Sequence, residues 1–90
     1  MTKSSHRHTV YFTKTVQKDY DSIRDLKLKR GIDRIIDDLK QNPYQFKKLS
    51  GPFASMRSAK TFSFRVLYTI EDEKLIVLII AIEHRRESYR

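Results

Sequence analysis

An unbroken run of apolar residues near the C-terminus, Leu75 to Ile82, constrains the fold of this chain more than any other feature. The run is rich in β-branched residues and far shorter than the ~20 residues that a membrane-spanning helix needs. A strand that is apolar at successive positions is typical of the middle of a sheet, where both faces are covered. We therefore predict a central strand over residues 75–82.

The preceding segment, Phe62 to Ile70, alternates large apolar residues with other residues. This alternation is the period of a strand with one buried face. Arg65 is therefore expected to point away from the face that carries Phe64 and Val66.

The two predicted strands are joined by the short, charged segment 71–74, which suits a hairpin connection. In an antiparallel hairpin, the residues that follow the second strand lie beside the start of the first. We therefore expect His84 and Arg85 to lie near Arg65, so that the polar C-terminal tail and this arginine share one site.

Upstream of the hairpin, residues 9–13 have strand composition, and Thr13 or Thr15 is expected to cap a first helix. A second helix is predicted by apolar residues at i, i+3, i+4 and i+7. These are Ile32, Ile35, Ile36 and Leu39.

This second helix is expected to begin near Asp25 despite Gly31, and to end at Asn42-Pro43, where proline opposes helix. Residues 44–52 are predicted to form a loop and residues 54–60 a further strand. The order β-α-α-β-β-β gives an α+β fold, with a helical hairpin packed on one face of a mostly antiparallel four-stranded sheet.

A chain of 90 residues is expected to form a single domain over residues 1–90. One face of its sheet is then left for a partner or substrate. Several aromatic residues recur at structural spacing and are predicted to lie in the core rather than to stack on a ligand. They are Tyr11, Tyr20, Phe62, Phe64 and Tyr68.

The formal net charge of +8 and the pI near 9.9 indicate attraction to polyanions. No carboxylate occurs between Asp38 and Glu71, while several cations do. A solvated basic surface that keeps the protein soluble is the alternative, although mixed signs are the usual device for solubility.

The absence of cysteine excludes disulfides and thiolate zinc sites. The N-terminus lacks the apolar core of a signal peptide, so a cytoplasmic location is expected. His6 and His8 have no third ligand nearby and are interpreted as incidental rather than as a metal site. The chain has no glycine-rich phosphate loop, and no serine or pair of carboxylates has the spacing found in hydrolases. Neither a cofactor nor a metal is therefore expected.

Four motifs give the chain a family resemblance: Leu49-Ser50-Gly51, the segment 56–60, the strand 64–70, and His84-Arg85 shortly before Tyr89. In order and spacing they resemble the RelE/ParE toxin superfamily over essentially the whole chain. The His-Arg-x-x-x-Tyr ending is more similar to the RelE branch, whose members cleave mRNA in the ribosomal A site. The resemblance implies a toxin of a type II toxin-antitoxin system, with an acidic antitoxin partner that masks its site.

The resemblance also implies a metal-independent endoribonuclease, in which the 2′-hydroxyl attacks the neighbouring phosphate on the ribosome. The candidate catalytic residues are Arg65, His84, Arg85 and Tyr89, and the candidate substrate-binding residues are Lys60, Arg57, Lys47 and Lys48. Two alternatives remain. One is a toxin of the ParE branch that inhibits DNA gyrase without nuclease chemistry, and the other is a degenerate member that acts only in a repressor complex with its antitoxin.

The chain departs from the family pattern at several positions. Met56 and Ser58 stand where some active members carry lysines, and Glu83 stands where a glycine is frequent. Arg57 is basic but one position out of phase, so a regular strand would point it to the other face of the sheet. Glu83 is expected to orient His84 or to weaken phosphate binding.

Overall fold

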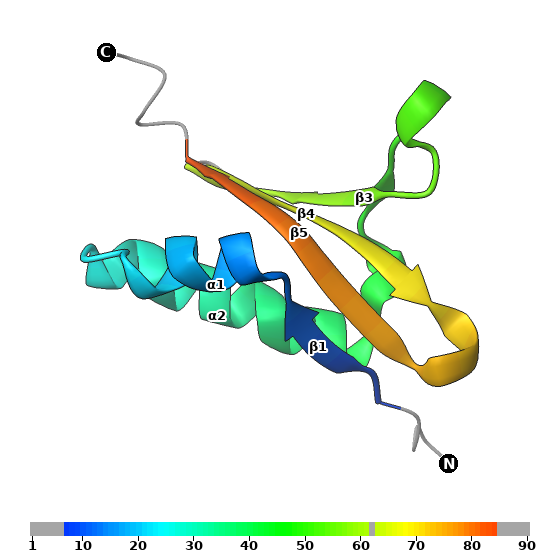
Figure 1. Ribbon diagram of the computed structural model, residues 1–90, viewed down its shortest axis with the longest axis horizontal. Helices are drawn as coiled ribbons and strands as arrows, with labels where there is room; N and C mark the ends of the chain where they lie inside the picture. The colour runs from blue at the N-terminus through cyan, green and yellow to red at the C-terminus, as the bar shows by residue number, and fades with distance from the viewer. Residues whose placement is uncertain (1–6, 62, 85–90) are drawn as a thin grey trace.

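The computed structural model describes residues 7–61 and 63–84, which form two helices packed on one face of a five-stranded sheet (Figure 1). The elements are β1 Thr9–Phe12, α1 Lys14–Asp21, α2 Leu26–Gln41, β2 Lys47–Lys48, β3 Arg57–Lys60, β4 Phe64–Glu71 and β5 Ile76–His84, with 3-10 turns η1 Pro43–Gln45, η2 Gly51–Phe53 and η3 Asp72–Lys74. The strand order is β1-β5-β4-β3-β2. This confirms the predicted α+β class with its helices on one sheet face.

The sheet has one strand more than predicted, and it is mixed because β1 runs parallel to β5. The additional strand, β2, lies inside the segment predicted to be a loop and pairs with the start of β3. A ladder of two residues has no hydrophobic period, which is why the sequence did not reveal it. The strand predicted from residue 54 begins only at Arg57, after η2.

Both helices begin at side-chain caps. The hydroxyl of Thr13 accepts a hydrogen bond from the backbone N–H of Val16, at 3.2 Å, and starts α1. The carboxylate of Asp25 accepts from the first turn of α2, which confirms the predicted start of the second helix near this residue.

Gly31 lies inside α2 because the helix passes close to β4 at this point. A Cβ atom at position 31 would lie 3.0 Å from Cε2 of Phe64, which is itself buried. The glycine therefore permits a close contact between helix and sheet, at the expense of helix propensity.

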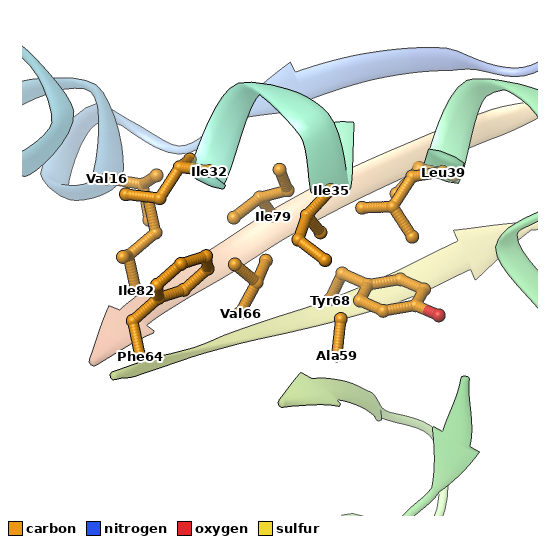
Figure 2. Packing of buried hydrophobic residues seen from close by; sticks show 11 residues of the cluster. Val16, Ile32, Ile35, Leu39, Ala59, Phe64, Val66, Tyr68, Ile79 and Ile82 are labelled. Atoms are coloured by element: carbon orange, nitrogen blue, oxygen red, sulfur yellow. The ribbon is translucent and has the colours of Figure 1, made fainter. Parts of the chain in front are cut away.

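The hydrophobic core fills the space between the helices and the sheet (Figure 2). It consists of Val16, Ile32, Ile35, Leu39, Ala59, Phe64, Val66, Tyr68, Val77, Ile79 and Ile82. Tyr68 is fully buried, and its hydroxyl donates a hydrogen bond to the carbonyl oxygen of Pro43 at 2.6 Å. Burial raises the pKa of the Tyr68 hydroxyl to about 12, so that the phenol keeps its proton well above the pH at which a free tyrosine ionises.

The predicted central strand, β5, does lie between β1 and β4, but the helices cover only one of its faces. Val77 and Ile79 are fully buried on that face, whereas Ile76 and Leu78 on the other are only half-buried. The prediction of a strand buried on both faces is therefore wrong. We call the sheet face without helices the open face.

The open face also carries Tyr11, which pairs with Leu78 and is 52% exposed. The prediction that Tyr11 lies in the core is wrong, because its neighbours Val10 and Phe12 take the inward positions of β1. Phe64 and Tyr68 are core residues as predicted, and Tyr20 is half-buried against the core, while Phe62 lies outside the described residues.

His8 has a structural environment that the sequence did not indicate. Its ring is buried and packs edge-on against the ring of Tyr44, with centroids 5.9 Å apart. Its backbone N–H donates to the carbonyl of Lys40, at the end of α2. His6 lies outside the described residues, within which no cluster of side chains could hold a metal ion and no helix is long and apolar enough to cross a bilayer.

Candidate functional site

Three residues on neighbouring strands form a row across the open face. In the antiparallel register, Lys60 of β3 lies opposite Arg65 of β4, and Arg65 lies opposite Glu83 of β5. Directly opposed residues project from the same face of a sheet. Phe64 and Val66 take the inward positions of β4, so the row projects outward, and its three residues are exposed. We call Lys60, Arg65 and Glu83 the site row.

The guanidinium of Arg65 forms an ion pair with Glu83 inside this row. The distance from Nε of Arg65 to Oε1 of Glu83 is 3.6 Å, longer than a hydrogen bond. Because both side chains are about half exposed to solvent, the pair is weak and can be displaced by another anion.

The turn between β3 and β4 holds the row in register. Among the described residues of this turn, which do not include Phe62, the hydrogen bonds are made by Thr61, whose backbone N–H donates to the carbonyl of Phe64 at 2.8 Å. The hydroxyl of Thr61 also accepts from the N–H groups of Ser63 and Phe64. Lys60 and Arg65 are consequently fixed side by side, since they flank this closed turn.

The basic residues of β2 separate onto the two faces. Lys47 lies opposite Ser58, which shares the strand face of Lys60, so Lys47 extends the basic surface of the open face. Lys48 lies opposite Arg57, so it projects from the other face of the sheet. Both lysines are exposed.

Arg57 does not join the site row. Its Nη1 donates to the backbone carbonyls of Phe46, at 2.9 Å, and Tyr44, at 3.3 Å, and its guanidinium lies 5.5 Å from the centroid of the Tyr44 ring. Tyr44 in turn donates a hydrogen bond to Asp72. The Arg57 side chain therefore holds the segment that follows α2. It projects from the sheet face opposite to that of Lys60, as the alternation along β3 predicted. This placement argues against Arg57 as a substrate-binding residue.

The C-terminal tail begins next to the site row. The backbone of His84 pairs with Phe64, one position beyond the pair of Arg65 and Glu83, so the predicted proximity of this residue to the start of β4 is confirmed for the backbone. The side chain of His84 and all of Arg85 and Tyr89 lie outside what the structure describes. Their roles stay predictions.

The site row can bind an anion. Lys60 and Arg65 supply an ammonium and a guanidinium on adjacent strands, roughly 5 Å apart at the backbone. Such groups form charge-assisted hydrogen bonds with phosphate oxygens. Sequence reasoning had found all three members of the row, but it had missed Thr61 and Tyr44, which no motif or period marks.

Comparison with known proteins agrees with this architecture. Residues 10–89 match the family model described as the ParE toxin of type II toxin-antitoxin systems, parDE. The chain is 32% identical to Toxin RelG of Mycobacterium tuberculosis over 84 residues. The aligned region covers 92% of this chain and 97% of that protein.

Two solved structures are similar over most of their length. The toxin-antitoxin complex RelBE2 from Mycobacterium tuberculosis contains a chain with a TM-score of 0.79 and 29% identity, covering 93% of this chain and 98% of that one. The isolated E. coli RelE toxin shares the fold, with a TM-score of 0.72 and 18% identity over 91% and 90% of the two chains.

These similarities define a class of protein, the toxins of type II toxin-antitoxin systems. This chain belongs to the ParE toxin family, within the RelE/ParE superfamily and on its RelE-like branch.

Proposed function

We propose that this toxin is a ribosome-dependent endoribonuclease that cleaves mRNA in the A site. The observation that carries the proposal is the site row, in which the β3–β4 register and the Thr61 turn fix Lys60 beside Arg65 on the open face. The C-terminal tail, with its His-Arg-x-x-x-Tyr motif, starts one residue beyond the row.

The proposed reaction needs neither a metal nor a water nucleophile. The 2′-oxygen of the substrate forms a bond to the adjacent phosphorus, and the bond from phosphorus to the 5′-oxygen breaks, which leaves a cyclic phosphate and a 5′-hydroxyl. One proton leaves the 2′-hydroxyl and one reaches the 5′-oxygen. General acid and base groups accelerate such steps by ~10² to 10⁴-fold.

Each candidate residue has a role in this scheme. Arg65 and Arg85 stabilise the charged phosphorane through charge-assisted hydrogen bonds, and Lys60 adds positive potential. His84 transfers a proton, because histidine is the side chain whose ordinary pKa lies near neutral pH. Tyr89 stacks on a base or donates a hydrogen bond to the phosphate.

We also propose a cognate acidic antitoxin as the protein partner, since related toxins have been solved in complex with antitoxins. The net charge of +8 favours an acidic partner. On this proposal the antitoxin masks the site row and its release frees the nuclease in the cytoplasm.

Primer extension on a translated mRNA tests the proposal directly. Wild-type toxin with ribosomes should give discrete, codon-phased cuts, and Arg65→Ala and His84→Ala should each reduce cleavage at least about tenfold. Lys74→Ala, an exposed change on the hairpin turn far from the row, is the matched control. A 2′-deoxy nucleotide at the cut site should abolish cleavage. Near wild-type rates for both variants would contradict the assignment.

The match to a model named after ParE favours one other candidate, a gyrase-inhibiting toxin without nuclease chemistry. Met56 and Ser58, in place of the lysines of some active relatives, agree with this alternative. Inhibition of DNA supercoiling by purified toxin, without any cut in translated mRNA, would establish it.

A further inference from the structure

The proposed cleavage moves two protons at two different oxygens. One proton leaves the 2′-hydroxyl as its oxygen attacks phosphorus, and another reaches the 5′-oxygen as it departs. The imidazole of His84 can serve one of these steps. In the site row, the charged groups of Lys60 and Arg65 carry donors but no acceptor lone pair, so neither can receive the 2′ proton. The third member of the row, Glu83, carries the acceptor that this step needs.

The carboxylate of Glu83 is open to a substrate. Its side chain is 56% exposed and lies on the open face, opposite Arg65 in the β4–β5 register. Nε of Arg65 lies 3.6 Å from Oε1 of Glu83, beyond hydrogen-bond length, so this ion pair leaves the carboxylate oxygens free to accept. An ionised carboxylate has acceptor sites only, about four on its two oxygens. Glu83 can therefore accept a proton from an incoming hydroxyl without first breaking a strong contact.

The order of the row places this acceptor at the edge of the phosphate site. A phosphate held by Lys60 and Arg65 lies over β3 and β4, and Glu83 follows on the next strand. Directly opposed residues have Cβ atoms about 4.5–5.5 Å apart. A 2′-oxygen that is ready to attack lies about 3–3.5 Å from the phosphorus. The carboxylate is thus within reach of the 2′-hydroxyl next to a phosphate that Arg65 binds.

In the part of the chain that the structure describes, no second carboxylate lies at this end of the open face. The acidic residues between positions 19 and 38 belong to the two helices or to the cap of α2, in the layer on the other side of the sheet (Figure 1). Glu71 is six positions from Arg65 along β4, about 20 Å away, and the acidic residues of η3 lie beyond it. A carboxylate at the row repels a bound phosphate, and a role confined to the transition state accounts for its presence there.

We propose that Glu83 is the general base of the cleavage reaction and that His84 is the general acid. This inference rests on the proposed function. Glu83 takes the proton of the 2′-hydroxyl while the bond from the 2′-oxygen to phosphorus forms. The bond from phosphorus to the 5′-oxygen breaks, its electron pair stays on that oxygen, and His84 gives the oxygen a proton. Glu83 then releases its proton to water, and His84 regains one from water.

A message with sulfur in place of the bridging 5′-oxygen at the cut site separates base from acid. A thiol has an ordinary pKa of about 8.5, against about 15.7 for water, so a thiolate departs without a proton donor. Loss of the general acid should therefore matter little with the sulfur message. Loss of the general base should matter equally with both messages, because the attacking 2′-hydroxyl is the same.

Single-turnover cleavage of ribosome-bound mRNA is measured with the oxygen and the sulfur message. Glu83→Gln should slow cleavage of both about 100-fold or more, which is the contribution of a general base. Glu83→Asp, which keeps the carboxylate on a shorter side chain, should recover part of the rate. His84→Ala should be slow with the oxygen message and close to wild type with the sulfur message.

Binding separates this catalytic role from substrate recognition. With a 2′-deoxy message that cannot be cut, Glu83→Gln should bind the ribosome complex at least as tightly as wild type, because it removes a negative charge from the row. Its thermal melt should match that of wild type, since the exposed ion pair is weak. Glu73→Gln in η3 is the matched control and should cleave within about threefold of wild type.

Glu87→Gln tests the rival carboxylate, which stands between Arg85 and Tyr89 in the sequence. Loss of cleavage in Glu87→Gln, with Glu83→Gln within about threefold of wild type, would overturn Glu83 as the base while the nuclease stands. Rescue of Glu83→Gln by the sulfur message would also overturn it, because Glu83 would then act at the leaving group or by orienting His84. If wild type cuts neither message, the proposed function fails and the general base fails with it.

Discussion

Arg65 and Glu83 face each other across β4 and β5, with Nε of Arg65 3.6 Å from a carboxylate oxygen of Glu83. The pair is exposed, so it contributes only about 0 to 1 kcal/mol to stability. Its importance lies in its position: the carboxylate stands where a phosphate bound by Arg65 would come. Glu83 is therefore an internal competitor of the substrate in the proposed site.

Replacing Glu83 by glutamine should strengthen RNA binding. A charge about 4 Å away interacts with a phosphate by about 1 kcal/mol in water, which corresponds to an affinity gain of about fivefold. Fluorescence anisotropy with a short single-stranded RNA measures the change, and Glu73→Gln, an exposed site in η3, is the control. Equal affinities for Glu83→Gln and wild type would show that the carboxylate does not face the RNA.

Arg57 and Lys60 should respond to substitution in opposite ways. Arg57→Ala removes hydrogen bonds from a charged donor to two backbone carbonyls, which should lower the free energy of unfolding by about 1 to 3 kcal/mol. Its cleavage rate at low temperature should stay within about threefold of wild type. Lys60→Ala should leave stability within about 0.5 kcal/mol but reduce cleavage at least about tenfold.

Urea unfolding and primer extension on the same preparations check this crossed pattern. If the folded Arg57→Ala variant lost cleavage, Arg57 would have to be a substrate-binding residue, contrary to its hydrogen bonds with the backbone of Tyr44 and Phe46.

Gly31→Ala should not give the stabilisation that alanine usually brings to a helix. The gain of about 1 kcal/mol in helix propensity is opposed by the contact of the new methyl group with Phe64, whose Cε2 would lie 3.0 Å away. In a Phe64→Leu background the contact is relieved, so the same substitution should become stabilising. Urea unfolding of the four proteins gives the coupling energy, and additive effects would exclude the contact.

Alkaline pH should destabilise the fold through two tyrosines. The pKa of Tyr68 is raised to about 12 by burial, and the pKa of Tyr20 to about 12 by its hydrogen bond to Asp33, against 10.0 for a free tyrosine. Since the unfolded chain loses these protons first, their contribution to stability is complete below pH 10 and is lost as the pH rises towards 12.

Urea unfolding of wild type, Tyr68→Phe and Tyr20→Phe at pH 9 and pH 11 measures this effect. Each phenylalanine variant should lose less stability than wild type between the two pH values, because lysine titration is common to all three proteins and cancels. Parallel losses in all three proteins would contradict the raised pKa values.

Several elements could be predicted from the sequence because their signals are local. Asp25 and Thr13 cap helices with their own side chains, and the spacing of Ile32, Ile35 and Leu39 defines the buried face of α2. The alternation around Arg65 likewise predicted its outward position, which depends only on the pleat of one strand.

The apolar run of β5 is a case in which local pattern was not enough. Ile79 and Ile82 both reach the core, although a regular strand would put them on opposite faces. The pairing of β4 with β5 shifts between Leu67 and Tyr68, which leaves Ile80 without a direct partner on β4. This bulge turns the side chain of Ile82 inward again, to the same face as Ile79. An unbroken apolar run cannot show such a bulge, because every register buries apolar residues.

By itself, the sequence determined the α+β class, the starts of both helices, the end of the second helix and the outward direction of Arg65, since each is encoded by neighbours along the chain. Only the tertiary structure decided that β1 lies parallel to β5, that Tyr11 is exposed, and that Arg57 binds backbone carbonyls instead of joining Arg65. These features depend on contacts between segments distant in sequence, such as β3 with the turn after α2. No local period records such contacts, because their free energy arises only when the packed core brings the segments together.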